Sequence, residues 1–161
     1  MYANNETGVI QNIREISKIV HSKNSILFCD ATQAIGKIPL DVQKDGIDLM
    51  AFTAHKMYGP KGVGALYVRR KNPRVKVTAQ MDGGGHERGM RSGTLNVPGI
   101  VGFGKACELC MQDMEEDTQR ISKLRNKLET ELMKLEEAYI NGSTEHRLPH
   151  VTNISFKRSP K

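Results

Sequence analysis

The sequence predicts an α/β domain built around a mainly parallel sheet, and three observations support this class. Residues 11–23 repeat apolar side chains at helical spacing, and short apolar runs follow at 25–29, 48–54 and 63–70. The first two runs lead directly into polar residues. The carboxyl ends of parallel strands form the edge where α/β proteins bind ligands, so chemistry is expected at those polar residues.

The helix predicted over residues 11–23, "QNIREISKIVHSK", has one apolar face, formed by Ile13, Ile16, Ile19 and Val20. After it, "SILFC" at 25–29 is typical of a short buried strand that ends at Asp30. The runs "DLMAFTA" and "VGALYVRR" predict two further strands.

From Pro98 onward the pattern becomes helical as far as Tyr139, which predicts one long helix or two joined helices. Its apolar residues recur at steps of three or four: Ile121, Leu124, Leu128, Leu132 and Leu135. Residues 141–150 contain turn-forming residues and predict a loop, and "VTNISF" at 151–156 alternates like a half-buried strand.

Composition restricts the class of protein. The net charge is +6, but Lys and Arg are dispersed, with short clusters such as Arg69, Arg70, Lys71 and Arg74. Because no aromatic residues alternate with them, a patch for anionic molecules or an acidic partner is favoured over nucleic-acid binding. Three cysteines, no long apolar run and no secretory signal indicate a reducing, cytoplasmic location without membrane insertion.

Both ends of the sequence are unusual for a complete domain. The opening residues "MYANNETG" are typical of a turn, and no helix or strand is predicted before them. The strand predicted at 151–156 has no predicted partner strand after it. We therefore expect the chain to be a fragment of a longer protein.

Candidate catalytic residues gather where two predicted strands end. Asp30 and Gln33 follow the first strand, and Thr53, His55 and Lys56 follow the second. A lysine at such an edge can form a Schiff base with an aldehyde, and a carboxylate can pair with a protonated pyridine nitrogen. Taken singly, each residue is as typical of a solvated loop, a helix cap or a structural hydrogen bond, so only the combination suggests a site.

Two further motifs carry weaker signals. Cys107 and Cys110 have C-x-x-C spacing, but they fall inside the predicted helix without further zinc ligands, so helix packing is favoured over metal or redox function. "GGGHERG" at 83–89 lacks the lysine and hydroxyl of a phosphate-binding P-loop.

The motifs "CDATQAIGKIPLD", "DLMAFTAHKMYGPKGVGALYVRR" and "GGGHERGMRSGT" together resemble the cysteine desulfurases. The resemblance is to the NifS and IscS-like branch of the class V aminotransferase group. Selenocysteine lyases and the other desulfurase branch share the His-Lys pair, but the third motif resembles this branch better. The resemblance implies a fold type I (aspartate aminotransferase-like) enzyme dependent on pyridoxal 5'-phosphate. Such enzymes take sulfur from L-cysteine, leaving alanine and an enzyme persulfide for iron-sulfur cluster or thio-cofactor assembly.

The resemblance also implies roles for individual residues. Lys56 corresponds to the lysine that binds the cofactor as a Schiff base, and Asp30 to the partner of its pyridine nitrogen. Gln33 corresponds to the residue that hydrogen-bonds the phenolic oxygen of the ring, and Asn5 to an asparagine near that oxygen and the substrate.

The phosphate of the cofactor would be held by two groups of residues. Thr53, where the family often has serine, and His55 match phosphate ligands within one subunit. Thr94 matches a residue that reaches the phosphate of the partner subunit, which implies a homodimer. A sulfur-acceptor or iron-sulfur scaffold protein is the further partner implied.

The resemblance divides the chain into residues 1–112, the later part of the large cofactor domain, and residues 113–161, a connecting helix and the start of an α+β small domain. The family's catalytic cysteine and substrate-binding arginine have no counterpart in this sequence. Two alternatives remain at this stage: a related pyridoxal phosphate lyase or aminotransferase, and a truncated product that acts at most as an interaction module.

Overall fold

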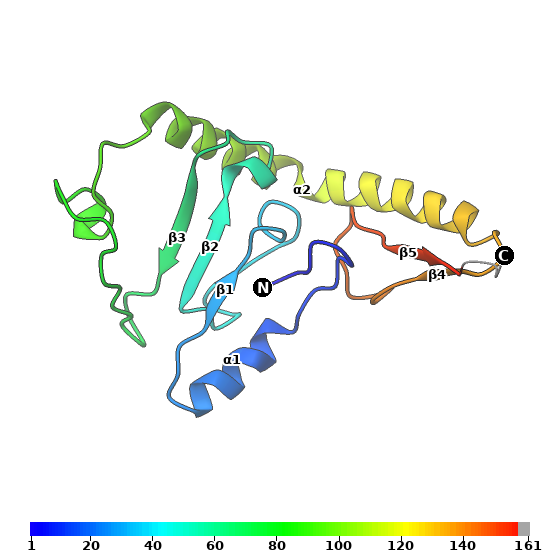
Figure 1. The fold of residues 1–161 in the computed structure, drawn as a ribbon, viewed down its shortest axis with the longest axis horizontal. Coiled ribbons are helices and arrows are strands. Elements are labelled where there is room, and N and C mark those ends of the chain that lie inside the picture. The colour runs from blue at the N-terminus through cyan, green and yellow to red at the C-terminus, as the bar shows by residue number, and fades with distance from the viewer. Residues whose placement is uncertain (158–161) are drawn as a thin grey trace.

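The computed structural model describes residues 1–157, and its α/β architecture confirms the predicted class. Its helices are α1 (Ile13–Ser22) and α2 (Val97–Leu132), with 3₁₀ turns η1 (Ala54–Lys56) and η2 (Glu87–Gly89). α2 extends along the length of the molecule, from beside one sheet to beside a second (Figure 1). Within residues 1–157, no helix combines the length and apolar character needed to cross a bilayer.

The larger sheet has the order β1 (Phe28–Asp30), β2 (Leu49–Thr53), β3 (Gly64–Val68). β1 and β2 are parallel, with Asp30 opposite Ala51, whereas β3 is antiparallel to β2. The predicted mainly parallel character therefore applies to one of the two pairings described. Residues 54–63, which connect β2 to β3, are too few for the crossover that a parallel strand needs.

The two predicted helices form, each with an asparagine at its start. Asn12 Oδ1 accepts from the Glu15 N–H at 3.4 Å, and Asn96 Oδ1 accepts from the Gly99 N–H at 3.2 Å. In α1, Ile13 is buried while Ile16 and Ile19 are exposed, so only part of its apolar face is covered by the described residues.

α2 is a single helix, which decides between the two possibilities that the sequence left open. The prediction of helix as far as Tyr139 is wrong, because residues 138–140 form a strand. This strand, β4 (Ala138–Ile140), pairs antiparallel with β5 (Ile154–Phe156). Glu137, just before β4, has a positive φ of 55°, a conformation that a helix does not continue through.

Two buried clusters hold the elements together. The larger one lies around β1 and β2 and includes Cys29, Ile47, Met50 and Leu148. The smaller one joins η1 to α2 through Ala54, Met57, Phe103 and Ala106, and the rings of Phe52 and Phe103 meet edge to face with centroids 5.8 Å apart. The second cluster fixes the turn that carries Lys56 against the first half of α2.

Candidate functional site

Asp30 and Thr53 end two parallel neighbouring strands, so they lie at the same edge of the sheet. The Ala31 N–H donates to the Ala51 carbonyl at 2.9 Å and continues the ladder to this edge. His55 and Lys56 follow Thr53 directly in η1. The sequence-based expectation that the two strand ends share one edge is confirmed.

A hydrogen bond joins Thr53 and His55. Thr53 Oγ1 lies 2.9 Å from His55 Nδ1 and 3.2 Å from the Val63 carbonyl oxygen. The hydroxyl can donate to the carbonyl while it accepts from a protonated Nδ1. His55 is exposed, so its imidazole stands beside solvent, and the Thr53 hydroxyl can donate to an anion such as phosphate once it turns away from the Val63 carbonyl.

Lys56 is the last residue of η1, and its side chain is exposed. The turn is closed by the N–H groups of Met57 and Gly59, which both donate to the Ala54 carbonyl at 2.9 Å. Ala54 and Met57 are buried against α2. The backbone of the turn is thus rigidly held, whereas the amine of Lys56 stays accessible to an aldehyde.

The Asp30 carboxylate accepts a hydrogen bond at 2.8 Å from the Thr32 N–H. Hydrogen bonding from Thr32, mainly from its side chain, holds the pKa of Asp30 below its ordinary value even though partial burial opposes this shift. Asp30 therefore stays ionised at neutral pH, as a partner for a protonated ring nitrogen must.

Gln33 and Asn5 belong to two different loops. Gln33 is half-buried in the loop that follows β1. The N-terminal segment is tied to the end of β1 by the Tyr2 N–H, which donates to the Asp30 carbonyl at 2.7 Å. The neighbouring Asn4 builds the turn by accepting from Glu6 N–H and Thr7 N–H, and Asn5 is left exposed.

Thr94 is exposed in the loop before α2, and no hydrogen bond in the described part of the chain connects it to Lys56 or Asp30. Its role at the phosphate of a partner subunit stays a prediction.

Lys37 was not among the residues predicted from the sequence. Its Nζ donates to the carbonyl oxygen of Lys56 at 2.7 Å. A lysine between glycine and isoleucine in a loop is typical of a solvated side chain, so no local signal separates it from others. Only the return of residues 31–37 toward η1 makes the contact.

The basic cluster predicted at residues 69–74 divides into two parts. Arg69 is buried, with Nε 3.0 Å from Asp48 Oδ1 and hydrogen bonds to the Val42 and Ile47 carbonyls. Arg70 and Arg74 instead line a groove of about 910 Å³ between β3 and η2, with Lys76 and Arg88. Glu87 also lines this groove, which is separate from the Lys56 turn, and the expected patch for anionic partners stays a prediction.

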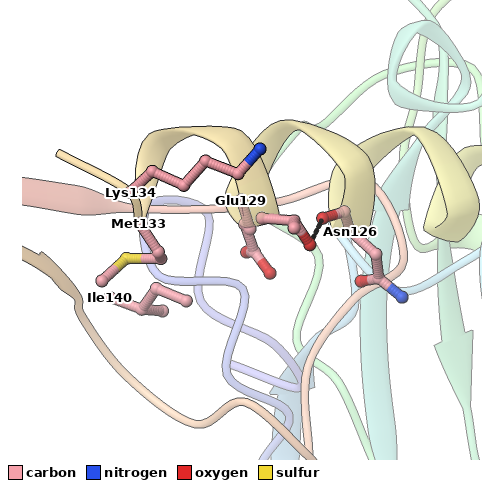
Figure 2. A pocket seen from close by; sticks show the side chains of 6 residues that line it. Asn126, Glu129, Met133, Lys134 and Ile140 are labelled. Atoms are coloured by element: carbon pink, nitrogen blue, oxygen red, sulfur yellow. Dashed lines mark hydrogen bonds between the residues drawn. The ribbon is translucent and has the colours of Figure 1, made fainter.

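A second hollow, of about 500 Å³, lies between the end of α2 and β4, and Figure 2 shows its lining side chains. Met133 and Ile140 lie next to one another in it, and the Glu129 side chain lies beside them. None of its lining residues belongs to the edge that carries Asp30 and Lys56, so the candidate site is assigned to the edge.

Comparison with known families matches residues 1–160 to the family described as Aminotransferase class-V. The chain belongs to the class V aminotransferase family. Proteins named "Cysteine desulfurase IscS" are similar to it. The one from Anaeromyxobacter dehalogenans is 57% identical over 97% of this chain and 39% of its own length. The one from Escherichia coli O139:H28 is 51% identical over 97% of this chain and 38% of its own length.

Solved structures of NifS-like proteins share the fold of this chain. A NifS-like protein from Rickettsia africae is 35% identical with a TM-score of 0.92, covering 98% of this chain and 43% of that one. Another NifS-like protein is 44% identical with a TM-score of 0.89, and the match covers 97% of this chain and 42% of that one. The chain thus spans about two fifths of the length of the relatives it matches.

Proposed function

We propose that this chain forms part of a pyridoxal phosphate-dependent cysteine desulfurase, which removes sulfur from L-cysteine and leaves alanine. The observation that carries the proposal is the edge shared by Asp30 and the Thr53–Lys56 turn, in a class V chain 51–57% identical to relatives named cysteine desulfurase. In this proposal the sulfur forms a persulfide on the enzyme. The persulfide then gives its outer sulfur to an acceptor or scaffold protein for iron-sulfur cluster or thio-cofactor assembly.

The residues at the edge fit pyridoxal phosphate in three respects. An accessible amine on a rigid turn suits its aldehyde, an ionised carboxylate suits its ring nitrogen, and a hydroxyl beside an imidazole suits its phosphate. The bound cofactor supplies an electron sink for the α-carbon of the substrate. In this proposal Lys56 attaches the cofactor, and Asp30 keeps the ring nitrogen protonated.

The remaining predicted residues complete the proposed site. Thr53 and His55 bind the phosphate, Gln33 orients the ring through its phenolic oxygen, and Asn5 lies near that oxygen and the substrate. Thr94, exposed in the loop before α2, reaches the phosphate of a second copy in a homodimer. The reaction would take place in the reducing cytoplasm, where the three free cysteines persist.

We also propose that residues 1–112 belong to the large cofactor domain and residues 113–161 to the connecting helix and small domain. Residues 158–161 lie outside the described part of the chain. The two-stranded sheet of β4 and β5, apart from the larger sheet in Figure 1, supports a second folding unit after α2.

The test is to incubate residues 1–161 with pyridoxal phosphate, reduce with borohydride and map the pyridoxyl group by mass spectrometry. We expect the label on Lys56 and expect Lys56→Ala to abolish it. Lys61→Ala, which changes the exposed loop five residues later, should leave the label on Lys56. In the longer protein that contains this chain, sulfide and alanine should then form from L-cysteine. Label on Lys37 or Lys61 would refute the proposed site, and turnover of another amino acid without sulfide release would indicate a related lyase or aminotransferase.

A further inference from the structure

Lys37 connects the turn that carries Lys56 to the middle of α2. Its Nζ donates to the Lys56 carbonyl oxygen at 2.7 Å, and its own carbonyl oxygen accepts from Thr118 Oγ1 at 3.1 Å. The three residues come from a loop, a 3₁₀ turn and a helix. One residue thus joins the candidate site to the helix by two hydrogen bonds.

The loop that carries Lys37 has little freedom to move. Gly36 has a positive φ of 72°, and a Cβ placed there would lie 2.9 Å from Cys110 Sγ and 3.0 Å from Met57 Cβ. A side chain at this position would therefore collide with α2 and with the residue after Lys56. The loop backbone is packed against both neighbours, which places Lys37 beside the Lys56 turn.

The ammonium group of Lys37 is held in an unfavourable environment. It is half-buried, and burial together with the nearby charge of Lys56 lowers its pKa. Within residues 1–157 no carboxylate forms an ion pair with it, and the charge nearby is the like charge of Lys56. The Lys56 carbonyl is thus the hydrogen-bond acceptor that compensates its partial loss of water.

We propose that Lys37 is a positioning residue that fixes the Lys56 turn through this carbonyl, so that the Lys56 side chain is directed to the Asp30 edge. The inference rests on the proposed function in that Lys56 is taken as the cofactor lysine. The hydrogen bond involves a charged donor and a backbone acceptor, so it constrains the main chain of η1 without occupying the amine of Lys56. Lys37 itself touches neither cofactor nor substrate in this proposal.

The first readout needs no cofactor. Amide hydrogen exchange is measured for Met57 and Gly59, whose N–H groups close the turn, in Lys37→Met and in the unaltered 161-residue chain. We expect exchange at both amides to become about tenfold faster in Lys37→Met, since one charge-assisted hydrogen bond is lost. The Ala31 amide, which belongs to the β1–β2 ladder, should be unaffected.

The second readout is the rate at which pyridoxal phosphate and borohydride label Lys56. Lys37→Met should slow it by about tenfold, Lys37→Arg should restore most of it by donating to the same carbonyl, and Lys61→Met should leave it unchanged. The positioning role would be overturned if amide hydrogen exchange at Met57 and Gly59 were unchanged in Lys37→Met, or if Lys37→Arg failed to restore labelling of Lys56. Absence of label on Lys56 in the unaltered chain would instead refute the proposed function. Amide hydrogen exchange at Met57 and Gly59 would still decide the role of Lys37.

Discussion

Arg147 binds Glu129 with both of its terminal nitrogens, one to each carboxylate oxygen. The Nη2–Oε2 distance is 2.7 Å, and both side chains are less than a tenth exposed. Thr152 donates to the same carboxylate, and Arg125 donates to the Leu148 carbonyl at 2.9 Å. The end of α2 is thereby joined to the segment that leads into β5.

Removing the charge of Glu129 should destabilise the chain strongly. Glu129→Gln leaves Arg147 buried without its counter-ion, and we expect the free energy of unfolding to fall by about 3 kcal/mol. Glu131→Gln is the matched control on the same helix, because Glu131 pairs with Lys134 at an exposed position and should change stability by about 0.5 kcal/mol or less. Urea denaturation measures both, and equal losses in the two variants would contradict the importance of the buried pair.

Tyr2 should ionise at an unusually high pH. Burial, followed by the charge of Asp45, raises the pKa of Tyr2 to about 12, and its hydroxyl donates to Asp45 Oδ2 at 3.1 Å. Because the folded state holds this proton more tightly than the unfolded state, the resulting stabilisation is complete below pH 10 and is lost as the pH rises toward 12. Absorbance titration of tyrosinate should show a component near pH 12 that Tyr2→Phe removes, and its persistence in that variant would disprove the assignment.

His150 should make the fold sensitive to acid. Burial, with the charges of Lys37 and Arg125, lowers the pKa of His150 from 6.5 to about 4, and its Nδ1 is buried without a hydrogen-bond partner among residues 1–157. The unfolded chain takes up this proton as pH falls below 6.5 while the folded chain does not, so stability declines between pH 6.5 and about 4. His150→Gln should remove about 1 to 3 kcal/mol of that decline. Urea midpoints at pH 7 and pH 5 test it, and an unchanged difference between the two would argue against this histidine.

Asp30→Ala should leave the fold intact but impair the cofactor. The carboxylate is exposed, so we expect little change in the free energy of unfolding. The bound ring would lose its charge partner, so turnover in the longer protein should fall by roughly a hundredfold or more. Asp30→Glu is the informative control, because it keeps the charge. Cofactor absorbance and alanine formation are measured together, and near-normal turnover of Asp30→Ala would remove Asp30 from its proposed role.

The sequence by itself determined the elements whose signals are local. Apolar spacing predicted α1 and most of α2, short apolar runs predicted β1, β2 and β3, and the order of motifs placed Lys56 after β2. Such signals depend on which face of a segment is buried, and a helix or strand repeats that choice every few residues.

Only the tertiary structure decided the relationships between distant segments. It set the antiparallel direction of β3, replaced the end of the predicted helix with β4, and brought Lys37 to the Lys56 carbonyl and Arg147 to Glu129. A lysine in a loop and a glutamate on a helix have the same local pattern whether they are solvated or paired. Their partners are fixed only when chain closure brings two segments together and removes water from between them.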